Sequence, residues 1–354
     1  MHAVILAGGE GKRLWPISKA DRPKFFLKFE DKISLLQKTF LRANSLKTVK
    51  NIITITGENY INQIKLDYSE LYSSQKPCRN EFLVEPSPKD TAAAILASAM
   101  FVEKKYGPDE TILILPTDHL IANQVGFAEA VVKGRKAASR GKIVTFGITP
   151  TYGEVNYGYI ETQNNKFKRF VEKPTKNLAE EYFLSGKFLW NSGILCSVVK
   201  VLLTEMKYYC PDLFKKVEQA FSSFVNHNSA NKEETFLDKH FWESIENISV
   251  DYALMEKSKK IAVIPCDIDW NDIGNWNSIG KLKATDMNGN NINGNALTYN
   301  VSNCYIESRG KMIAAVGVKN LAIIETENGL LIVDRQNVAD VKEIFSMIKE
   351  KARL

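Results

Sequence analysis

Glycines and cations near the start of the chain are the first residues that could do chemistry. They lie in the stretch LAGGEGKRLWPISKADRPKFF. Glycine lets a backbone turn sharply and bring its N–H groups close to an anion, and Lys and Arg supply countercharge for phosphates. These residues are Gly8, Gly9, Gly11, Lys12, Arg13 and Lys24. Because they follow the apolar run of residues 2–7, they predict a nucleotide site at the end of a strand.

Two common nucleotide motifs do not fit this loop. A P-loop requires Lys followed by Ser or Thr after its last glycine, but Lys12 is followed by Arg13. The dinucleotide fingerprint requires a third glycine where this chain has Leu14. A simple strand-to-helix turn is the alternative, but such a turn would not need Arg13 and Lys24. The loop therefore predicts a phosphate site of another kind and disfavours a dinucleotide-dependent oxidoreductase.

Two acidic positions could hold a metal ion. Asp118 lies just past the apolar run TILILP, in PTDHLI, and Asp272 lies in DWNDIGNW. Mg²⁺ prefers carboxylate and phosphate oxygens, so these residues are candidate Mg²⁺ ligands beside a phosphate loop. Either aspartate could instead form a turn. Asp267 and Asp269 are alternative ligands that the sequence does not separate from Asp272.

Two further segments carry polar groups suited to a sugar phosphate. Glu172 and Lys173 are adjacent in FVEKP, and neighbouring residues on a strand point to opposite faces. Both can serve one ligand only if the strand ends there, which Pro174 favours; an ordinary surface pair is the alternative. Asn191 in WNSGI has a polar tip suited to sugar hydroxyls, and Gly193 permits close approach.

The elements that must position these residues form an α/β pattern in the first half of the chain. Short β-branched runs, apolar on both faces, alternate with helical patterns, which is typical of a mainly parallel sheet covered on both sides. The expected strands are His2–Ala7, Asn51–Gly57, Glu81–Pro86, Thr111–Pro116 and Lys142–Ile148, and the expected helices are Ile33–Leu46, Lys89–Tyr106 and Gly126–Arg140. Ligands bind beyond the carboxyl ends of such strands, where the glycine loop lies. We therefore predict a Rossmann-like, mixed but mainly parallel sheet.

The pattern changes in the rest of the chain. The middle predicts strands at Tyr157–Thr162, Lys168–Val171 and Ile261–Ile268, and helices at Leu178–Ser185, Leu213–Phe224 and Val250–Lys257. After the polar stretch NGNNINGN come four β-like runs and a closing helix: Asn303–Glu307, Met312–Gly317, Leu321–Glu325, Leu330–Asp334 and Asn337–Lys351. We expect a catalytic domain over residues 1–284 and a small β domain over 285–354. A short left-handed β-helix is one form of the latter, although no clean repeat is visible.

Composition excludes several classes of protein. The net charge of +6 comes from cations spread along all 354 residues, with no basic block, so nucleic acid is not an expected partner. There is no apolar run of about 18 residues and no signal-peptide pattern, so we expect a cytoplasmic protein without a membrane partner. The five cysteines lack CxxC spacing and the four histidines lack metal-ligand spacing, which argues against disulfides and a zinc site.

Eight motifs in order resemble one family. They are LAGGEGKRLWPISKADRPKFF, VEPSPKDTAAA, ILPTDHLI, GITPTYGEVNYGYIE, FVEKP, LWNSGI, SVDYALMEK and DWNDIGNW. Together they cover nearly the whole chain and resemble the nucleotide-sugar pyrophosphorylases and, more closely, the bacterial mannose-1-phosphate guanylyltransferases. The resemblance implies a nucleotidyltransferase fold and the transfer of a nucleotidyl group from GTP to mannose 1-phosphate, giving GDP-mannose and pyrophosphate. It also implies Mg²⁺ as cofactor.

The resemblance assigns roles residue by residue. It implies catalytic roles for Arg13, Lys24, Asp118 and Lys173, and Mg²⁺ ligation by Asp118 and Asp272. The implied nucleotide-binding residues are Leu6, Ala7, Gly8, Gly9, Gly11, Lys12, Arg13, Glu85, Thr91, Ala92 and Asp118. The implied sugar-phosphate-binding residues are Gly158, Glu172, Lys173, Asn191 and Asp272.

The chain also departs from the family pattern. The family shows Asn-Thr-Ala-Pro where this chain has Asp90 to Ala93, and Thr-Gly where it has Val155 and Asn156. An acidic residue at position 90 can alter base contacts, so the same reaction with another sugar 1-phosphate, such as a heptose phosphate, or another nucleotide is one alternative. A non-catalytic, regulatory nucleotide-sugar-binding subunit is a second. The family also leads us to expect a homodimer, and the isomerase activity of its longer members is not expected here.

Overall fold

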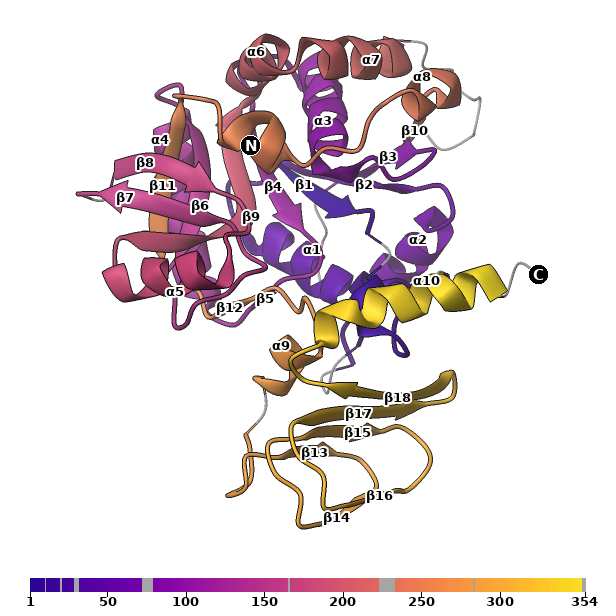
Figure 1. Cartoon of the computed structure of the whole chain (residues 1–354). Helices are drawn as coiled ribbons and strands as arrows, with labels where there is room; N and C mark the ends of the chain where they lie inside the picture. Colours follow the sequence, from indigo (N-terminus) through magenta and orange to yellow (C-terminus); the bar gives the residue numbers. More distant parts are fainter. Residues whose placement is uncertain are drawn as a thin grey trace. The chain divides into compact units, whose positions relative to one another are not determined.

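The strands expected in the first half of the chain are present in the computed structural model of the protein (Figure 1). β1 (His2–Ala7), β2 (Asn51–Gly57) and β4 (Thr111–Pro116) have the expected bounds. β3 (Arg79–Glu85) and β6 (Ile143–Ile148) differ from expectation by one or two residues at an end. Their side chains are almost all buried on both faces, which is why β-branched runs fit here.

The structure describes residues 1–9, 11–19, 21–28, 32–71, 79–164, 166–222, 233–282 and 284–351. The chain forms two compact units, each built from separate stretches of sequence. The first unit comprises Met1–Gly8, Leu36–Thr117 and Ile121–Trp270, and the second comprises Gly9–Leu35, Asp118–Leu120 and Asn271–Leu354. The domain boundary expected after residue 284 stays a prediction.

The first unit is built on a ten-stranded sheet with the order β10-β3-β2-β1-β4-β9-β6-β11, to which β7 and β8 are added through β9. The remaining strands are β7 (Tyr159–Gln163), β8 (Lys166–Val171), β9 (Phe188–Val198), β10 (Glu234–Phe236) and β11 (Ile261–Cys266). Strands β10, β3, β2, β1 and β4 run parallel, whereas β9 is antiparallel to its neighbours β4 and β6. The predicted mixed, mainly parallel sheet is confirmed.

Helices cover this sheet. They are α1 (Leu35–Ser45), α2 (Ile61–Ser69), α3 (Asp90–Tyr106), α4 (Gln124–Ala138), α5 (Lys176–Ser185), α6 (Val199–Tyr209), α7 (Pro211–Ser222) and α8 (Lys239–Glu243). In Figure 1, α3, α6 and α7 lie together over one face of the sheet, and their buried side chains share one core with β1, β2 and β4. Five buried alanines in α3 let this helix lie close to its neighbours.

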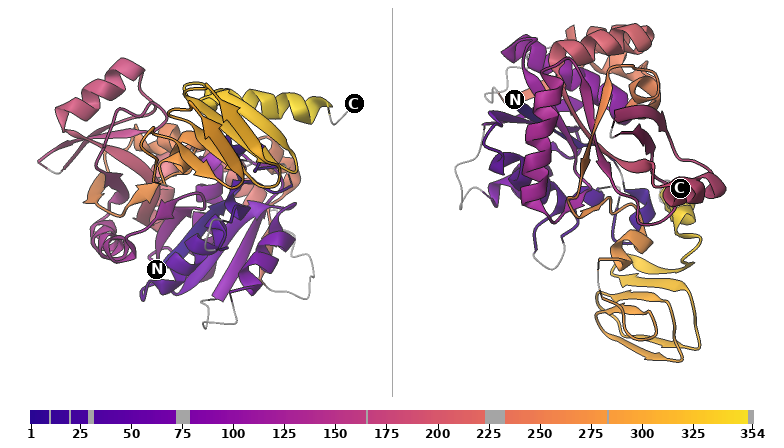
Figure 2. Two further views of the ribbon diagram at one scale, coloured as in Figure 1. Left: turned by 90° about the horizontal axis from the view of Figure 1, so that it is seen from below. Right: turned by 90° about the vertical axis from the view of Figure 1, so that its left-hand side faces the viewer.

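The second unit joins an N-terminal stretch to the C-terminal part of the chain. Its elements are η1 (Lys12–Leu14), η2 (Lys24–Phe26), α9 (Trp276–Gly280), β13 (Asn291–Asn293), β14 (Ala296–Tyr299), β15 (Tyr305–Ser308), β16 (Ile313–Val316), β17 (Leu321–Thr326), β18 (Gly329–Asp334), η4 (Val338–Asp340) and α10 (Val341–Lys351). Leu14, Trp276 and Tyr305 share one buried core. Figure 2 shows the strands stacked as the coils of a short solenoid, with parallel pairs β13–β15, β15–β17 and β14–β16.

Several expectations about elements are corrected. The sequence did not predict α2, α6, α8 or the full length of β9, which contains the WNSGI stretch. The helix expected at Val250–Lys257 is a π-helical turn, Asp251–Met255. The strand expected to reach Ile268 ends at Cys266. The end of the helix expected at Leu213–Phe224 and the cysteine at position 78 lie outside the described residues.

Two further observations concern the expectations from composition. Within the described ranges, no helix is long and apolar enough to cross a membrane. Cys196, Cys210, Cys266 and Cys304 are free thiols.

The short strands β5 (Leu120–Ile121) and β12 (Trp270–Asn271) pair with each other and complete the set of described elements.

Candidate active site

The turn of the glycine loop requires glycine at position 11. Gly11 has a φ of +66°, and a Cβ there would clash with the Cβ of Lys24. Its carbonyl oxygen accepts a hydrogen bond from the Ser18 hydroxyl at 2.7 Å. Only glycine adopts this backbone conformation without strain and also leaves room for Lys24. The turn therefore fixes the path of the chain that carries the loop cations.

The loop cations lie on η1, which is anchored by a buried Leu14. Lys12 is exposed and Arg13 is half-buried. Arg13 makes no ion pair with any residue in the described part of the chain. Its guanidinium is therefore available to an anionic ligand, as a phosphate-binding arginine requires.

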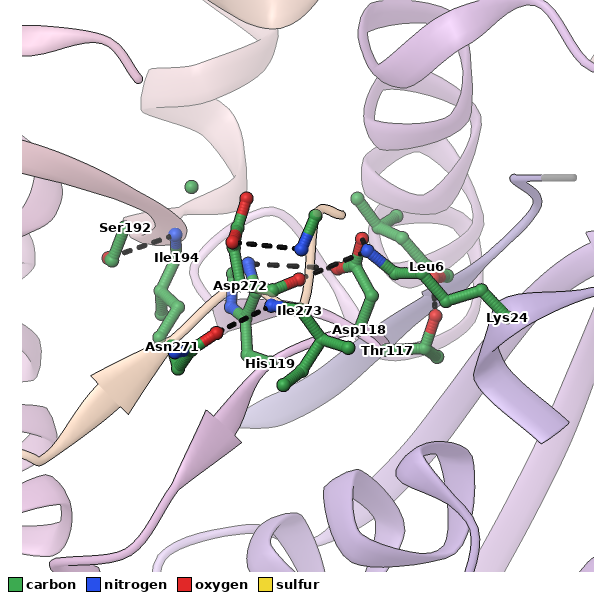
Figure 3. A network of polar contacts seen from close by, with 12 residues as sticks. Leu6, Lys24, Thr117, Asp118, His119, Ser192, Ile194, Asn271, Asp272 and Ile273 are labelled. Atoms are coloured by element: carbon green, nitrogen blue, oxygen red, sulfur yellow. Dashed lines mark hydrogen bonds and ion pairs between the residues drawn. The ribbon is translucent and has the colours of Figure 1, made fainter. Parts of the chain in front are cut away.

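Lys24 joins the two aspartates that the sequence singled out. Its side chain is almost fully buried, with Nζ 2.8 Å from Asp118 Oδ2 and 3.0 Å from the backbone oxygen of Asp272 (Figure 3). Burial by itself raises the pKa of Asp118, but the charges of Lys24 and His119 and hydrogen bonds to the carboxylate outweigh it. The pKa of Asp118 is therefore below its ordinary value, and this carboxylate is ionised at neutral pH. We call Lys24, Asp118 and Asp272 the phosphate cluster.

The phosphate cluster fits a magnesium ion in its donor set. Among the residues that the structure describes, no group of three or more His, Cys, Asp or Glu side chains could hold a metal. Mg²⁺ is bound through one or two carboxylates, with water and substrate phosphates completing the shell, so Asp118 and Asp272 suffice. Of the three alternatives in the sequence, only Asp272 is tied to Lys24. The backbone oxygens of Asp267 and Asp269 instead accept hydrogen bonds from residues 122–123.

Glu85 is a buried carboxyl group at the end of β3 in the first unit. It is 4% exposed, and its Oε1 lies 2.7 Å from the position that a Cβ on Gly8 would take. Its Oε2 has no hydrogen-bond partner in the described structure. Burial raises the pKa of Glu85 to about 8. A buried, unsatisfied carboxyl oxygen is costly to keep, which points to a ligand that supplies the missing donor.

The start of α3 and the end of β1 are fixed by backbone contacts. The Thr91 hydroxyl accepts a hydrogen bond from the Val250 N–H at 2.9 Å, and the Ala92 N–H donates to the Ile248 oxygen at 3.2 Å. The Asp90 carboxylate accepts from the Thr91 N–H at 2.6 Å and is exposed. The carbonyl oxygens of Leu6 and Ala7, at the end of β1, accept from the hydroxyls of Thr117 and Thr56. These contacts leave the Thr91 hydroxyl hydrogen available for a further acceptor.

The four expected sugar-phosphate residues of the first unit lie together. Glu172 Oε2 lies 2.7 Å from the position of a Cβ on Gly158, and the Gly158 oxygen accepts from the Asn191 N–H at 2.8 Å. Lys173 Nζ is 2.6 Å from Glu172 Oε1. β8 ends at Val171 and Lys173 has a φ of +42°, so the chain turns and both side chains reach one side. The strand therefore ends before Glu172 and Lys173, as it must if both side chains are to serve one ligand.

Asp251 is a residue of this cluster that the sequence reasoning missed. Its Oδ1 accepts a hydrogen bond from Asn191 Nδ2 at 3.0 Å. Burial, then the negative charge of Glu172, raise the pKa of Asp251 to about 7, against the opposing effect of Lys173. The stretch SVDYALMEK was the available signal, but nothing in its spacing tied Asp251 to Asn191. We call Gly158, Glu172, Lys173, Asn191 and Asp251 the sugar cluster.

Comparison with known proteins identifies the family of the chain. A family model described as "Nucleotidyl transferase" matches residues 2–289. The chain belongs to the nucleotidyl transferase family. A second model, described as "MannoseP isomerase/GMP-like beta-helix domain", matches residues 294–347. The resemblance inferred from the eight motifs and the nucleotidyltransferase class are thus confirmed, as is a C-terminal β domain of β-helix type.

Individual relatives are similar over the full chain. The mannose-1-phosphate guanylyltransferase RfbM of Salmonella typhimurium is 35% identical over 99% of this chain and 73% of its own length. Mannose-1-phosphate guanylyltransferase 2 of Escherichia coli O157:H7 is also 35% identical, over 99% of this chain and 74% of its own length. A solved structure from Thermus thermophilus, described as a mannose-1-phosphate geranyltransferase, has a TM-score of 0.82 and 26% identity. The match covers 98% of this chain and 99% of the other.

Proposed function

We propose that this nucleotidyltransferase is a Mg²⁺-dependent mannose-1-phosphate guanylyltransferase. A phosphate oxygen of mannose 1-phosphate attacks the α-phosphorus of GTP, the bond from this phosphorus to the bridging oxygen breaks, and pyrophosphate leaves with GDP-mannose as the other product. The observation that carries the proposal is the double contact of Lys24 with Asp118 and Asp272. It joins a cation to the carboxylate of one candidate metal ligand and to the backbone oxygen of the other, from three distant parts of the sequence. The names of the full-length relatives support the two substrates.

Glu85 is the proposed reader of the base. Guanine presents two adjacent donors, N1–H and the N2 amino group, on its pairing edge, whereas the other common bases present one donor group there. An ionised carboxylate accepts from both, and the Oε2 of Glu85 lacks any other partner in the described structure. The Asp90 carboxylate, the departure from the family pattern, already accepts from the Thr91 N–H. Glu85 therefore favours GTP over other nucleotides.

The sugar cluster is the proposed site of the attacking substrate. The Lys173 ammonium binds the phosphate and the Asn191 amide and Glu172 carboxylate bind sugar hydroxyls. Partial burial acts to lower the pKa of Lys173, but its hydrogen bond and ion pair with Glu172 raise it, so this side chain stays charged. A phosphate monoester is mostly dianionic at neutral pH, so its oxygen attacks without a general base. Positioning and charge neutralisation are then the main contributions of the protein.

The phosphate cluster and Arg13 are proposed to act on the triphosphate. Asp118 and Asp272 would hold Mg²⁺, which when bound neutralises phosphate charge in the transition state. Lys24 and Arg13 stabilise the charge that develops on the departing pyrophosphate. Lys24 is held in place by the Asp118 carboxylate, so little side-chain entropy is lost when substrate binds.

The direct test is pyrophosphate release across a grid of nucleoside triphosphates and sugar 1-phosphates, with and without Mg²⁺. We expect release with GTP and mannose 1-phosphate and only with Mg²⁺ present. Faster turnover with a heptose 1-phosphate or with thymidine triphosphate would replace the substrate assignment and keep the reaction class. No release with any pair would contradict the enzyme and favour a regulatory subunit that binds without catalysis.

A further inference from the structure

Asp251 occupies an unusual backbone position. It opens the π-helical turn Asp251–Met255, a rare conformation that is frequently found at functional sites. The residue before it, Val250, donates its N–H to the Thr91 hydroxyl, which ties this turn to the start of α3. The turn is therefore fixed, and with it the direction of the Asp251 side chain.

The side-chain amide of Asn191 is held from two sides. Its Nδ2 donates to Asp251 Oδ1 at 3.0 Å, and its Oδ1 accepts from the Thr145 hydroxyl at 2.7 Å and from the Gly193 N–H at 3.3 Å. The Gly193 N–H can only donate, so it holds the oxygen end of the amide, whereas the Thr145 hydroxyl can donate or accept. Asp251 holds the opposite end of the amide, because its Oδ1 accepts from the Asn191 amino group.

The charges around Asp251 come from several elements. Glu172 and Lys173 follow β8, Asp90 begins α3, and Tyr252 is its neighbour in the turn; the first three act on the Asp251 carboxylate. Glu172 and Asp90 repel the negative charge of Asp251, and Lys173 attracts it. A carboxylate is kept at this position against two other carboxylates, which an ordinary packing residue would not require.

We infer that Asp251 is a positioning residue of the sugar cluster. It commits one N–H of the Asn191 amide to itself, and so orients the other N–H toward a hydroxyl of the sugar phosphate. Asp251 acts through Asn191 and does not contact the reacting atoms. This inference rests on the proposed function, because it assumes that Asn191 binds the sugar.

Kinetic constants of two Asp251 variants test the inference. Asp251→Ala removes the acceptor, and we expect the KM for mannose 1-phosphate to rise about tenfold with the KM for GTP unchanged. Asp251→Asn keeps an oxygen that can accept from Asn191, so its KM should stay within about threefold of wild type. Glu205→Ala is a matched control, because it also removes a buried, paired carboxylate of the first unit, bonded to Ser258 and Lys260. It should leave both KM values unchanged.

A double-mutant cycle separates action through Asn191 from an independent contact. If Asp251 works only through Asn191, adding Asp251→Ala to Asn191→Ala changes the KM for mannose 1-phosphate no further. The inference would be overturned if the two substitutions raised the KM for mannose 1-phosphate by factors that multiply in the double variant. It would also be overturned if Asp251→Ala alone had the wild-type KM. Either result would leave the proposed function intact. If Asp251→Ala does not fold, Thr145→Val, which loosens the other end of the amide, must raise the same KM or the inference fails. A wild-type protein without any pyrophosphate release contradicts both proposals.

Discussion

Asp118 and Glu85 are both acidic residues near the carboxyl ends of parallel strands, but their surroundings differ. Asp118 pairs with the Lys24 ammonium at 2.8 Å, and its pKa lies below its ordinary value. Within the described ranges, Glu85 has no cation beside it and one of its oxygens is unpartnered, and burial raises its pKa to about 8. One carboxyl is therefore permanently ionised and the other is largely neutral near pH 7.

The difference matches the chemistry proposed for each residue. Phosphates and Mg²⁺ require fixed charges that compensate one another before the substrate arrives, as Lys24 and Asp118 do. A purine base is neutral and brings no charge that needs compensation, so the buried Glu85 binds it by hydrogen bonds, accepting from guanine in its ionised form. The carboxyl group thus serves two tasks, because the neighbours of each residue set its ionisation.

Substitution of Asp118 should have the largest effect on activity and so gives the strongest test of this comparison. Asp118→Asn removes the fixed charge that holds Lys24, and we expect kcat to fall about 10³-fold with the fold retained. Steady-state kinetics at saturating Mg²⁺ and circular dichroism measure the two quantities. Asp109→Asn is the control, since it removes an exposed carboxylate paired with Lys200 and should change neither. Near wild-type turnover of Asp118→Asn would remove this residue from the metal and phosphate roles.

Substitution of Gly11, in the turn that places Lys24, should have the next largest effect on activity. Gly11→Ala adds backbone strain and a clash with Lys24, so we expect kcat/KM to fall roughly 100-fold and the unfolding free energy to fall by about 2–3 kcal/mol. Gly141→Ala separates the two causes, because Gly141 has a φ of +77° but nothing within 4 Å of its Cβ position. That control should lose about 1 kcal/mol. Equal losses in denaturant titrations of both variants would mean that the contact with Lys24 is unimportant.

Titration of Glu85 should give the smallest effect, a change in the KM for GTP with pH, and it tests the difference in ionisation between Glu85 and Asp118. With a pKa of about 8, Glu85 is about one-tenth ionised at pH 7 and half ionised at pH 8, so the KM for GTP should fall about fivefold between them. Glu85→Gln should remove this pH dependence of the KM for GTP. A ratio of wild-type to variant KM that does not change with pH would exclude the proposal that ionised Glu85 binds the base.

The same titration affects stability with a defined sign. The pKa of Glu85 is raised on folding, so between its ordinary value and pH 8 the unfolded chain has lost a proton that the folded chain still holds. Stability therefore decreases as pH rises through that range. Thermal melts of wild type should show this decrease, and Glu85→Gln should lessen it.

The sequence predicted well those features that depend on local pattern. The bounds of β1, β2 and β4 follow from β-branched runs that are buried on both faces. Lys24, Asp118 and Asp272 were singled out by residue type and by their place after apolar runs. Their joining in one cluster depends on contacts across 248 residues, which only the fold supplies.

Features that depend on distant partners were not predicted. Asp251 belongs to the sugar cluster through a hydrogen bond to Asn191, 60 residues away, and a carboxylate in a short helical turn gives no local sign of this. A short β-helix was one expected form of the C-terminal β domain, but the repeat of its coils was not visible in the sequence. Asn291 pairs with Tyr305, 14 residues on, whereas Tyr305 pairs with Ala322, 17 residues on, so no constant period exists to be seen.

The split composition of the second unit has a consequence for protein synthesis. The hydrogen-bonded pair Lys24 and Asp272 is separated by 248 residues, and a ribosome adds about 5–20 residues per second. On the order of ten seconds or more therefore passes between the synthesis of the glycine loop and the synthesis of Asp272. The loop that is translated first is among the last parts of the chain to reach its native contacts. Until then, its cations and apolar side chains must be kept from other partners.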